Sequence, residues 1–233
     1  MKQRLSELKI FKKIAKKEAI KVVALGSSST QRFMCGMHWF DYVELGFKNT
    51  DYRVGQFINS GVSNDSTVQW LERFDNECAV YKPDLVLFTV GANDCRLEHS
   101  LEKFKKNLME LYDRIKGTGA DLVFQTFYPL DMERAKGAWL KIEEYIPVVR
   151  QVAEETGSLL IDTEKRWKKL RDYNIELYRA LLRDFAHLNE MGNMVLGLDI
   201  MRFFNTGLLV KDGQIDYCRD GLLLQHKIDS LDR

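Results

Sequence analysis

Long apolar runs are absent from this sequence. No stretch approaches the roughly 20 apolar residues that span a bilayer, and the start, Met1-Lys2-Gln3-Arg4-Leu5, lacks the continuous apolar segment of a signal peptide. We therefore expect a cytoplasmic protein without a membrane-spanning helix. Cysteine is also scarce, with four residues and no C-x-x-C pair in a chain of 233. This scatter favours reduced thiols over a disulfide framework or a zinc site.

A strong charge imbalance is missing as well, because the formal net charge is only +1. Such a balance argues against a nucleic-acid-binding specialist. The sequence has no G-x-G-x-x-G, P-loop or H-E-x-x-H motif, so we expect neither a cofactor nor a metal. It also lacks G-x-S-x-G, the signature of the α/β-hydrolase nucleophile turn, because Thr30 stands where the second glycine would be.

The first residues predict a basic amphipathic helix. Apolar residues recur at helical spacing between residues 3 and 18, and residues 1–21 contain eight Lys or Arg but two Glu. Such a helix could contact an anionic membrane or an acidic partner. A solvated helix packed on the domain is the favoured interpretation. We assign residues 1–20 to this helix.

Short apolar runs alternate with helical patterns through the middle of the chain. Most runs lack polar alternation, as expected for strands that are covered on both faces. Alternating strands and helices predict a three-layer α/β/α fold around a parallel sheet. The five expected strands are 22–25, 56–59, 85–90, 122–127 and 159–161, and the helices between them are 37–47, 66–80, 101–117 and 141–156.

The last third of the chain predicts two more helices and then a change of character. The helices are expected at 164–183 and 188–204. Two apolar segments around Asp212-Gly213 then indicate a β-hairpin, followed by a short helical tail. We expect one domain, with its main body at 21–205 and the hairpin and tail, 206–233, packed on it.

Polar clusters follow the expected strands where a parallel sheet gathers its reactive groups. They are Gly26-Ser27-Ser28-Ser29-Thr30, Asn59-Ser60-Gly61, Gly91-Ala92-Asn93-Asp94 and, before a late helix, Asp184-Phe185-Ala186-His187. Each cluster alone is typical of a turn or a helix cap. Their joint order at successive strand ends predicts an active site.

The residue types in these clusters suit acyl transfer by a serine. A serine hydroxyl needs a base, and His187 is the one histidine with an acid, Asp184, placed to orient it, whereas His38, His99 and His226 have none at suitable spacing. We expect Ser28 to be the nucleophile. The oxyanion would be stabilised by the Ser28 and Gly61 amides and the Asn93 side chain.

These four clusters resemble the blocks of the SGNH (GDSL-type) hydrolase family. The resemblance implies a flavodoxin-like five-stranded sheet, Ser28 as nucleophile, Gly61 and Asn93 in the oxyanion hole, and Asp184 with His187 completing the triad. It also implies an esterase acting on small, short acyl esters. The chain departs from the family at Ser27, where the usual residue is Asp, and this bears on loop geometry more than on reaction type.

Other activities of the same fold stay open at this point. Lysophospholipase or thioesterase activity and acyl transfer to an acceptor other than water would use the same residues. A non-catalytic binding protein with this fold is the contrasting hypothesis, although it has no need of Ser28, Asn93, Asp184 and His187 together. The sequence predicts no oligomeric state.

Overall fold

The computed structural model describes residues 5–33, 36–50 and 55–231. It divides into two compact units. We call 1–32, 55–127 and 135–162 the sheet unit, and 33–54, 128–134 and 163–233 the helical unit. Among the described residues, no helix is both long and apolar enough to cross a membrane.

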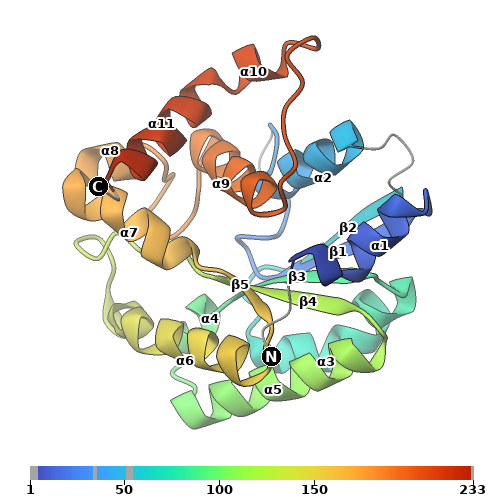
Figure 1. Ribbon diagram of the computed structural model, residues 1–233. Coiled ribbons are helices and arrows are strands. Elements are labelled where there is room, and N and C mark those ends of the chain that lie inside the picture. Colours follow the sequence, from blue (N-terminus) through green and yellow to red (C-terminus); the bar gives the residue numbers. More distant parts are fainter. Residues whose placement is uncertain (1–4, 34–35, 51–54, 232–233) are drawn as a thin grey trace. The chain divides into compact units, whose positions relative to one another are not determined.

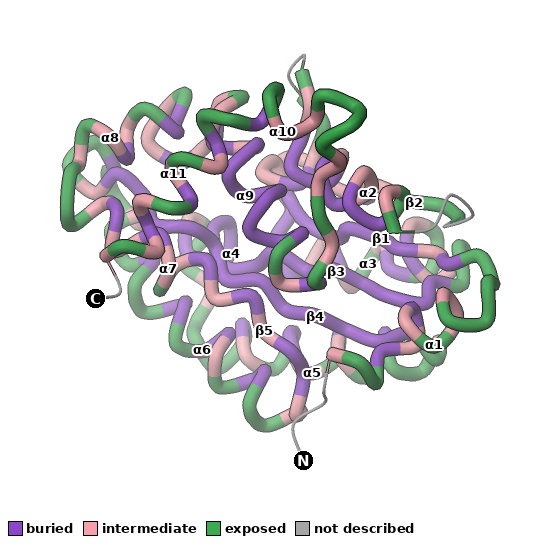
Figure 2. Tube along the Cα trace, turned by 45° about the horizontal axis from the view of Figure 1, so that its top comes forward, coloured by how far each residue is buried: buried purple, intermediate pink, exposed green. Residues whose placement is uncertain are grey.

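The sheet unit is built on five parallel strands in the order β2-β1-β3-β4-β5. This is the flavodoxin-like order, and the five predicted strands are confirmed. Their burial explains the continuous apolar runs, since every residue of β3 and β4 is buried (Figure 2). The strands are β1 (Ile20–Gly26), β2 (Gly55–Gly61), β3 (Leu85–Val90), β4 (Asp121–Thr126) and β5 (Leu159–Ile161).

Helices connect these strands, and α3, α5 and α6 lie along one face of the sheet (Figure 1). The predicted helix at 101–117 matches α5 residue for residue. The α-helices of this unit are α1 (Lys9–Ala15), α3 (Thr67–Glu77), α4 (Ala92–Arg96), α5 (Leu101–Gly117) and α6 (Ile142–Glu155), and its 3-10 helices are Leu5–Glu7, Ala79–Tyr81 and Gly137–Lys141.

The amino-terminal helix is shorter than predicted. Residues 1–4 of the assigned range 1–20 lie outside the described residues, α1 ends at Ala15 although the helical spacing extends to residue 18, and Ile20 already belongs to β1. Lys17 adopts a left-handed φ of 61°, and the amides of Lys17 and Glu18 bond back to the carbonyls of Ile14 and Lys13. This hydrogen-bond pattern is a Schellman ending, which closes the helix before the strand begins.

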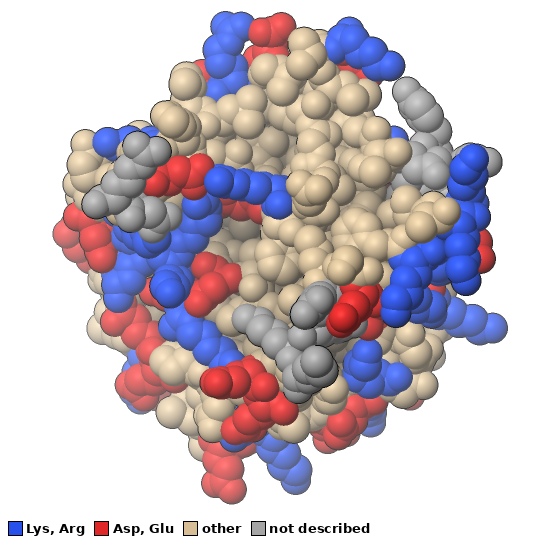
Figure 3. Space-filling model, in the orientation of Figure 1, with Lys and Arg blue, Asp and Glu red and all other residues tan. Residues whose placement is uncertain are grey.

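Helix α1 packs on the sheet unit, as the favoured interpretation held. Leu8 and Ile10 are fully buried. The Asp84 carboxylate, at the start of β3, accepts from Lys9 Nζ at 2.9 Å and Lys13 Nζ at 2.8 Å. Asp84 therefore neutralises part of the positive charge of α1 within the unit. On the face drawn in Figure 3, Lys and Arg side chains are interspersed with Asp and Glu among the described residues.

Replacing Asp84 by asparagine is expected to lower the free energy of unfolding by about 1–3 kcal/mol at pH 7. Burial raises the pKa of Asp84, but hydrogen bonds from Lys13, Lys9 and the Lys21 amide outweigh it and hold the pKa below its usual value. The stabilisation is therefore complete above the unfolded pKa of about 3.9 and disappears as the pH falls through the folded pKa.

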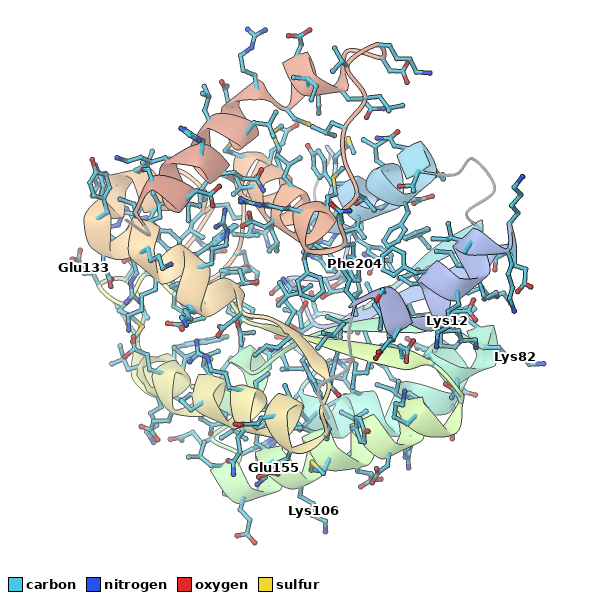
Figure 4. All side chains as sticks on the ribbon, viewed as in Figure 1. Lys12, Lys82, Lys106, Glu133, Glu155 and Phe204 are labelled. Carbon is cyan, nitrogen blue, oxygen red and sulfur yellow. The ribbon has the colours of Figure 1, made fainter. Side chains whose placement is uncertain are left out.

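Urea unfolding at pH 7 and in acid checks this expectation. Lys12→Gln is the matched control, because Lys12 lies on the same helix and is exposed (Figure 4). The gap between wild type and Asp84→Asn should narrow below about pH 4. An equal gap at both pH values would contradict the assigned ion pairs.

The helical unit has a core around α9, which is buried along most of its length. A side chain at Gly197 would place its Cβ 2.5 Å from Cβ of Tyr42, so glycine allows α2 and α9 to pack closely. Phe204, just after α9, contacts Phe47 of α2 with ring centroids 5.4 Å apart (Figure 4). The helices of this unit are α2 (Trp39–Thr50), α7 (Thr163–Tyr173), α8 (Ile175–Arg179), α9 (Glu190–Phe203), α10 (Gln214–Tyr217) and α11 (Arg219–Ser230).

Two predictions for the last third of the chain are wrong. The helix expected at 164–183 is broken, because the Asn174 side chain caps a second helix by accepting from the Leu177 amide. The helical tail expected after residue 205 is confirmed as α11, but the hairpin before it is absent from the described residues, and its second apolar segment forms α10 (Figure 1). Gly213 has a left-handed φ of 70° but precedes α10, and Cys218, Gly221 and Ile228 bury one side of the following segment, which is a helical pattern.

The cysteines that the structure describes are unpaired. Cys78, Cys95 and Cys218 are free and buried, and Cys35 lies outside the described residues. Burial raises the pKa of Cys78 to about 12 and that of Cys95 to about 11. These two thiols therefore stay protonated near neutral pH and act as small apolar groups.

Candidate active site

Ser28 lies in a tight turn directly after β1. The carbonyl of Ser27 accepts hydrogen bonds from the amides of Thr30 at 2.9 Å and Gln31 at 2.8 Å, which form a single helical turn. Ser28 occupies the start of this turn and is partly exposed. A buried strand followed at once by a turn places the hydroxyl at the carboxyl end of the sheet, where open α/β proteins carry their reactive groups.

The unusual Ser27 contributes to this turn through its backbone. The two bonds that close the turn use its carbonyl, which any residue provides. The Ser27 side chain is buried, with 7% of the residue exposed. A serine at this position therefore closes the turn that presents Ser28 without a contribution from its side chain to these two bonds.

Gly61, at the end of β2, touches the turn that carries Ser28. A Cβ at this position would lie 2.2 Å from the Gln31 amide nitrogen and 2.4 Å from the Thr30 carbonyl carbon, so only glycine fits. The Gly61 amide donates to Asn59 Oδ1 at 3.0 Å. This predicted oxyanion donor is thus already engaged, and it would serve a substrate by sharing its hydrogen between two acceptors.

Asn93 lies in α4, a five-residue helix that follows β3. Its side chain is held at both ends: Nδ2 donates to the Asp65 carbonyl at 2.9 Å, and Oδ1 accepts from Arg96 Nε at 3.2 Å. A side-chain amide carries two hydrogens on Nδ2, so one remains for an oxyanion. The two bonds fix the orientation of the group, which is what an oxyanion donor requires.

Asp94 anchors the same short helix through hydrogen bonds to Thr67 and His99. It is fully buried and accepts from the Thr67 amide, the Thr67 hydroxyl at 2.5 Å and His99 Nδ1 at 3.1 Å. Burial raises the pKa of Asp94, and the bonds from Thr67 and His99 offset only part of that rise. The prediction that His187 alone has an orienting acid is therefore wrong, because His99 also has one. The spacing of five residues, across a helix end, hid this pair from the sequence.

Asp184 and His187 form a hydrogen-bonded pair in the helical unit. The two carboxylate oxygens lie 3.0 and 2.9 Å from His187 Nδ1, and Oδ1 also accepts from the amides of Ala186 and His187 at 2.8 Å each. Burial raises the pKa of Asp184, but these hydrogen bonds outweigh it and hold the pKa below its usual value. A charged carboxylate on Nδ1 selects the neutral tautomer whose Nε2 can accept a proton.

This pair lies in a loop that precedes α9, as the sequence predicted for the cluster. The loop is closed by an antiparallel bridge between Leu182 and Leu188 and by a bond from the Arg183 amide to the His187 carbonyl at 2.9 Å. Helix α9 begins only at Glu190, and Asn189 caps it. The Asp184 carboxylate therefore does not cap α9; it closes the loop through the Ala186 and His187 amides and bonds the His187 ring.

The predicted site residues fall into two groups. Ser28, Gly61 and Asn93 belong to the sheet unit, where they follow β1, β2 and β3. Asp184 and His187 belong to the helical unit and contact each other there. Each group carries one half of the chemistry of a serine hydrolase: a hydroxyl with oxyanion donors, and an oriented base.

A family model covers most of this chain. Residues 24–195 match the GDSL-like lipase/acylhydrolase family, and this range includes all five candidate residues. The chain belongs to this family. The GDSL-like chain is accordingly a carboxylic ester hydrolase.

Relatives of known structure share the fold. An acetylxylan esterase from Geobacillus stearothermophilus is 26% identical over 182 residues, covering 73% of this chain and 78% of the relative. The crystal structure of Axe2, an acetylxylan esterase from that organism, matches with a TM-score of 0.68 at 21% identity, covering 79% of this chain and 94% of Axe2. LAE5, an α/β hydrolase enzyme from the metagenome of Lake Arreo in Spain, matches with a TM-score of 0.68 at 21% identity, covering 81% and 97% of the two chains.

Variants of Axe2 have been solved as catalytic mutants. In three of them a serine, an aspartate or a histidine is replaced by alanine, and the aspartate precedes the histidine by three residues. Asp184 precedes His187 in this GDSL-like chain by the same interval.

Proposed function

We propose that this esterase hydrolyses small acyl esters, acetyl or other short-chain, with Ser28, His187 and Asp184 as its catalytic triad. The observation that carries the proposal is the Asp184 carboxylate on His187 Nδ1, because it prepares Nε2 to accept a proton. The matching spacing and residue types of the Axe2 catalytic mutants support it. So does the position of Ser28 in a tight turn after the first strand.

In the first half-reaction, Ser28 Oγ attacks the ester carbonyl carbon and His187 Nε2 takes the hydroxyl proton. The carbonyl oxygen becomes an oxyanion that accepts hydrogen bonds from the Ser28 amide, the Asn93 side chain and the shared Gly61 amide. Collapse of this intermediate breaks the bond to the alcohol, which leaves with the proton from His187. The product is an acyl-enzyme at Ser28.

In the second half-reaction, water attacks the acyl-enzyme while His187 Nε2 accepts its proton. The tetrahedral intermediate collapses, Ser28 Oγ leaves with that proton, and the carboxylic acid is released. Asp184 stays charged throughout and stabilises the imidazolium that forms in both halves. This charge is secure at neutral pH because the pKa of Asp184 lies below its usual value.

The acyl group favoured here is acetyl, because the curated relative is an acetylxylan esterase. The same residues would serve a lysophospholipase, a thioesterase or an acyltransferase, and a chain-length profile separates a short-acyl esterase from a lysophospholipase. Rates on p-nitrophenyl esters from acetate to palmitate should fall with chain length. A maximum at long chains would contradict the short-acyl assignment.

Covalent labelling tests the proposed nucleophile directly. A fluorophosphonate probe should modify Ser28, and tandem mass spectrometry can place the label among the three consecutive serines. Ser27→Ala and Ser29→Ala are the matched controls and should keep labelling, whereas Ser28→Ala should lose it. Labelling at another serine, or none in the wild type, would contradict the triad.

A further inference from the structure

One arginine connects the three segments that carry the oxyanion donors. Arg73 lies in α3, two turns after the loop that follows β2, and its side chain is 13% exposed. Its Nη2 donates to the carbonyl of Gly26 at 3.2 Å and to that of Ser60 at 2.8 Å. Its Nε donates to Asp65 Oδ2 at 2.5 Å.

Each of these partners is adjacent to a candidate oxyanion donor. Gly26 ends β1 two residues before Ser28, and Ser60 directly precedes Gly61. The third partner, Asp65, holds Asn93 because its carbonyl accepts from Asn93 Nδ2 at 2.9 Å. A single planar guanidinium thus fixes the spacing between the turn, the end of β2 and the helix that carries Asn93.

The Gly26 carbonyl accepts two further hydrogen bonds, which restrain the end of β1. Besides Arg73, it accepts from the Val62 amide at 3.1 Å and from Trp70 Nε1 at 3.1 Å. The Trp70 ring in turn packs edge-on against Phe88 of β3, with ring centroids 4.8 Å apart. Three donors on one carbonyl restrict the peptide that leads into Ser28.

Stability alone does not account for this arrangement. A buried ion pair contributes little net stability, since loss of solvation offsets the attraction. Burial raises the pKa of Asp65 in spite of the Arg73 hydrogen bond, so desolvation outweighs the attraction here. What the pair supplies is a fixed geometry for the loop between β2 and α3.

The geometry points to Arg73 as a positioning residue that sets the oxyanion hole by holding Gly26, Ser60 and Asp65 in register. This inference rests on the proposed function, because it assigns Arg73 to the Ser28 reaction. Arg73 acts through backbone groups and is not expected to touch substrate. Its removal should therefore lower kcat more than it changes KM.

Two variants separate the guanidinium geometry from its charge. Arg73→Gln removes both, and Arg73→Lys keeps a cation for Asp65 but cannot donate to two carbonyls and a carboxylate together. Both are expected to lower kcat for p-nitrophenyl acetate by about 10- to 100-fold, with KM within about threefold of wild type. Glu77→Gln is the matched control: Glu77 accepts from Arg73 Nη1 at 2.8 Å, its side chain is 47% exposed, and kcat should be preserved.

Hydrogen exchange supplies a readout that does not depend on activity. In Arg73→Gln and Arg73→Lys, peptides covering 24–32 and 57–66 should exchange faster than in wild type and Glu77→Gln, while those covering α5 stay protected. Urea unfolding and far-UV circular dichroism check that the variants are folded. If Arg73→Gln does not fold, Arg73→Lys, which is the smaller change, still provides the test.

The outcomes distinguish failure of the Arg73 role from failure of the proposed function. Rescue of kcat by Arg73→Lys, or unchanged kcat in both variants, would overturn the positioning role while the triad stands. Absence of Ser28-dependent turnover in the wild type would instead remove the proposed function. In that case exchange rates decide, and unchanged protection at 24–32 and 57–66 would overturn the role of Arg73 as well.

Discussion

Replacing His187 by alanine is expected to lower kcat for p-nitrophenyl acetate by about 10⁴-fold or more. Without the imidazole no base removes the Ser28 proton, and only the oxyanion donors and binding remain. His187 is partly exposed, with 29% of its side chain accessible, so the variant should fold with nearly unchanged stability. Steady-state kinetics and urea unfolding on the same preparation check both parts.

His99→Ala is the decisive comparison, because His99 also carries an orienting acid. The Asp94 carboxylate that it contacts is fully buried and held by Thr67, so this pair anchors α4. We expect His99→Ala to lose less than about tenfold in kcat and to be the less stable variant, since it leaves the Asp94 carboxylate short of a donor. A larger loss in His99→Ala than in His187→Ala would reverse the assignment of the base.

Replacing Gly61 by alanine is expected to abolish activity and to destabilise the protein by about 3 kcal/mol or more. The added Cβ would overlap backbone atoms, at 2.2 Å from the Gln31 nitrogen and 2.4 Å from the Thr30 carbonyl carbon. Backbone cannot rotate away as a side chain can, so either β2 or the turn that carries Ser28 must shift. Because Gly26 and Gly61 are paired across β1 and β2, that shift reaches the segment before Ser28.

Gly117→Ala is the matched control for this prediction. Gly117 ends α5, and a Cβ there would meet no atom within 4 Å. Alanine at that position should leave activity unchanged and should stabilise the protein by up to about 1 kcal/mol, because the unfolded chain loses freedom. Urea denaturation and ester turnover are measured for both variants. A soluble, fully active Gly61→Ala protein would contradict the close approach between β2 and the turn.

The regular elements of the sheet unit were predictable because their apolar patterns are local. Strands buried on both faces need continuous apolar residues, which identified β3 and β4 closely. Helix α5 has both a serine cap at Ser100 and a long amphipathic pattern, and its bounds were predicted without error. Helix α4 was missed, because five residues are too few to show a period and Gly91-Ala92-Asn93-Asp94 is typical of a turn.

The hairpin predicted near the end of the chain is wrong for a related reason. The Asp-Gly pair at Asp212 favours a hairpin locally, yet the Gly213 carbonyl accepts from the Tyr217 amide at 3.0 Å and opens the short helix α10. A glycine with positive φ fits a hairpin turn and also the residue before a helix. Local signals alone therefore could not distinguish the two.

By itself the sequence determined the five strands, the fold class, the pairing of Asp184 with His187 and the residue types that an ester hydrolase needs. Those properties depend on periodicity and on residue chemistry, which are written along the chain. Only the tertiary structure decided two further arrangements: His99 bonds the Asp94 carboxylate, and Arg73 binds Gly26, Ser60 and Asp65 together. These contacts join backbone and side-chain groups whose sequence separation carries no periodic signal, so packing alone reveals them.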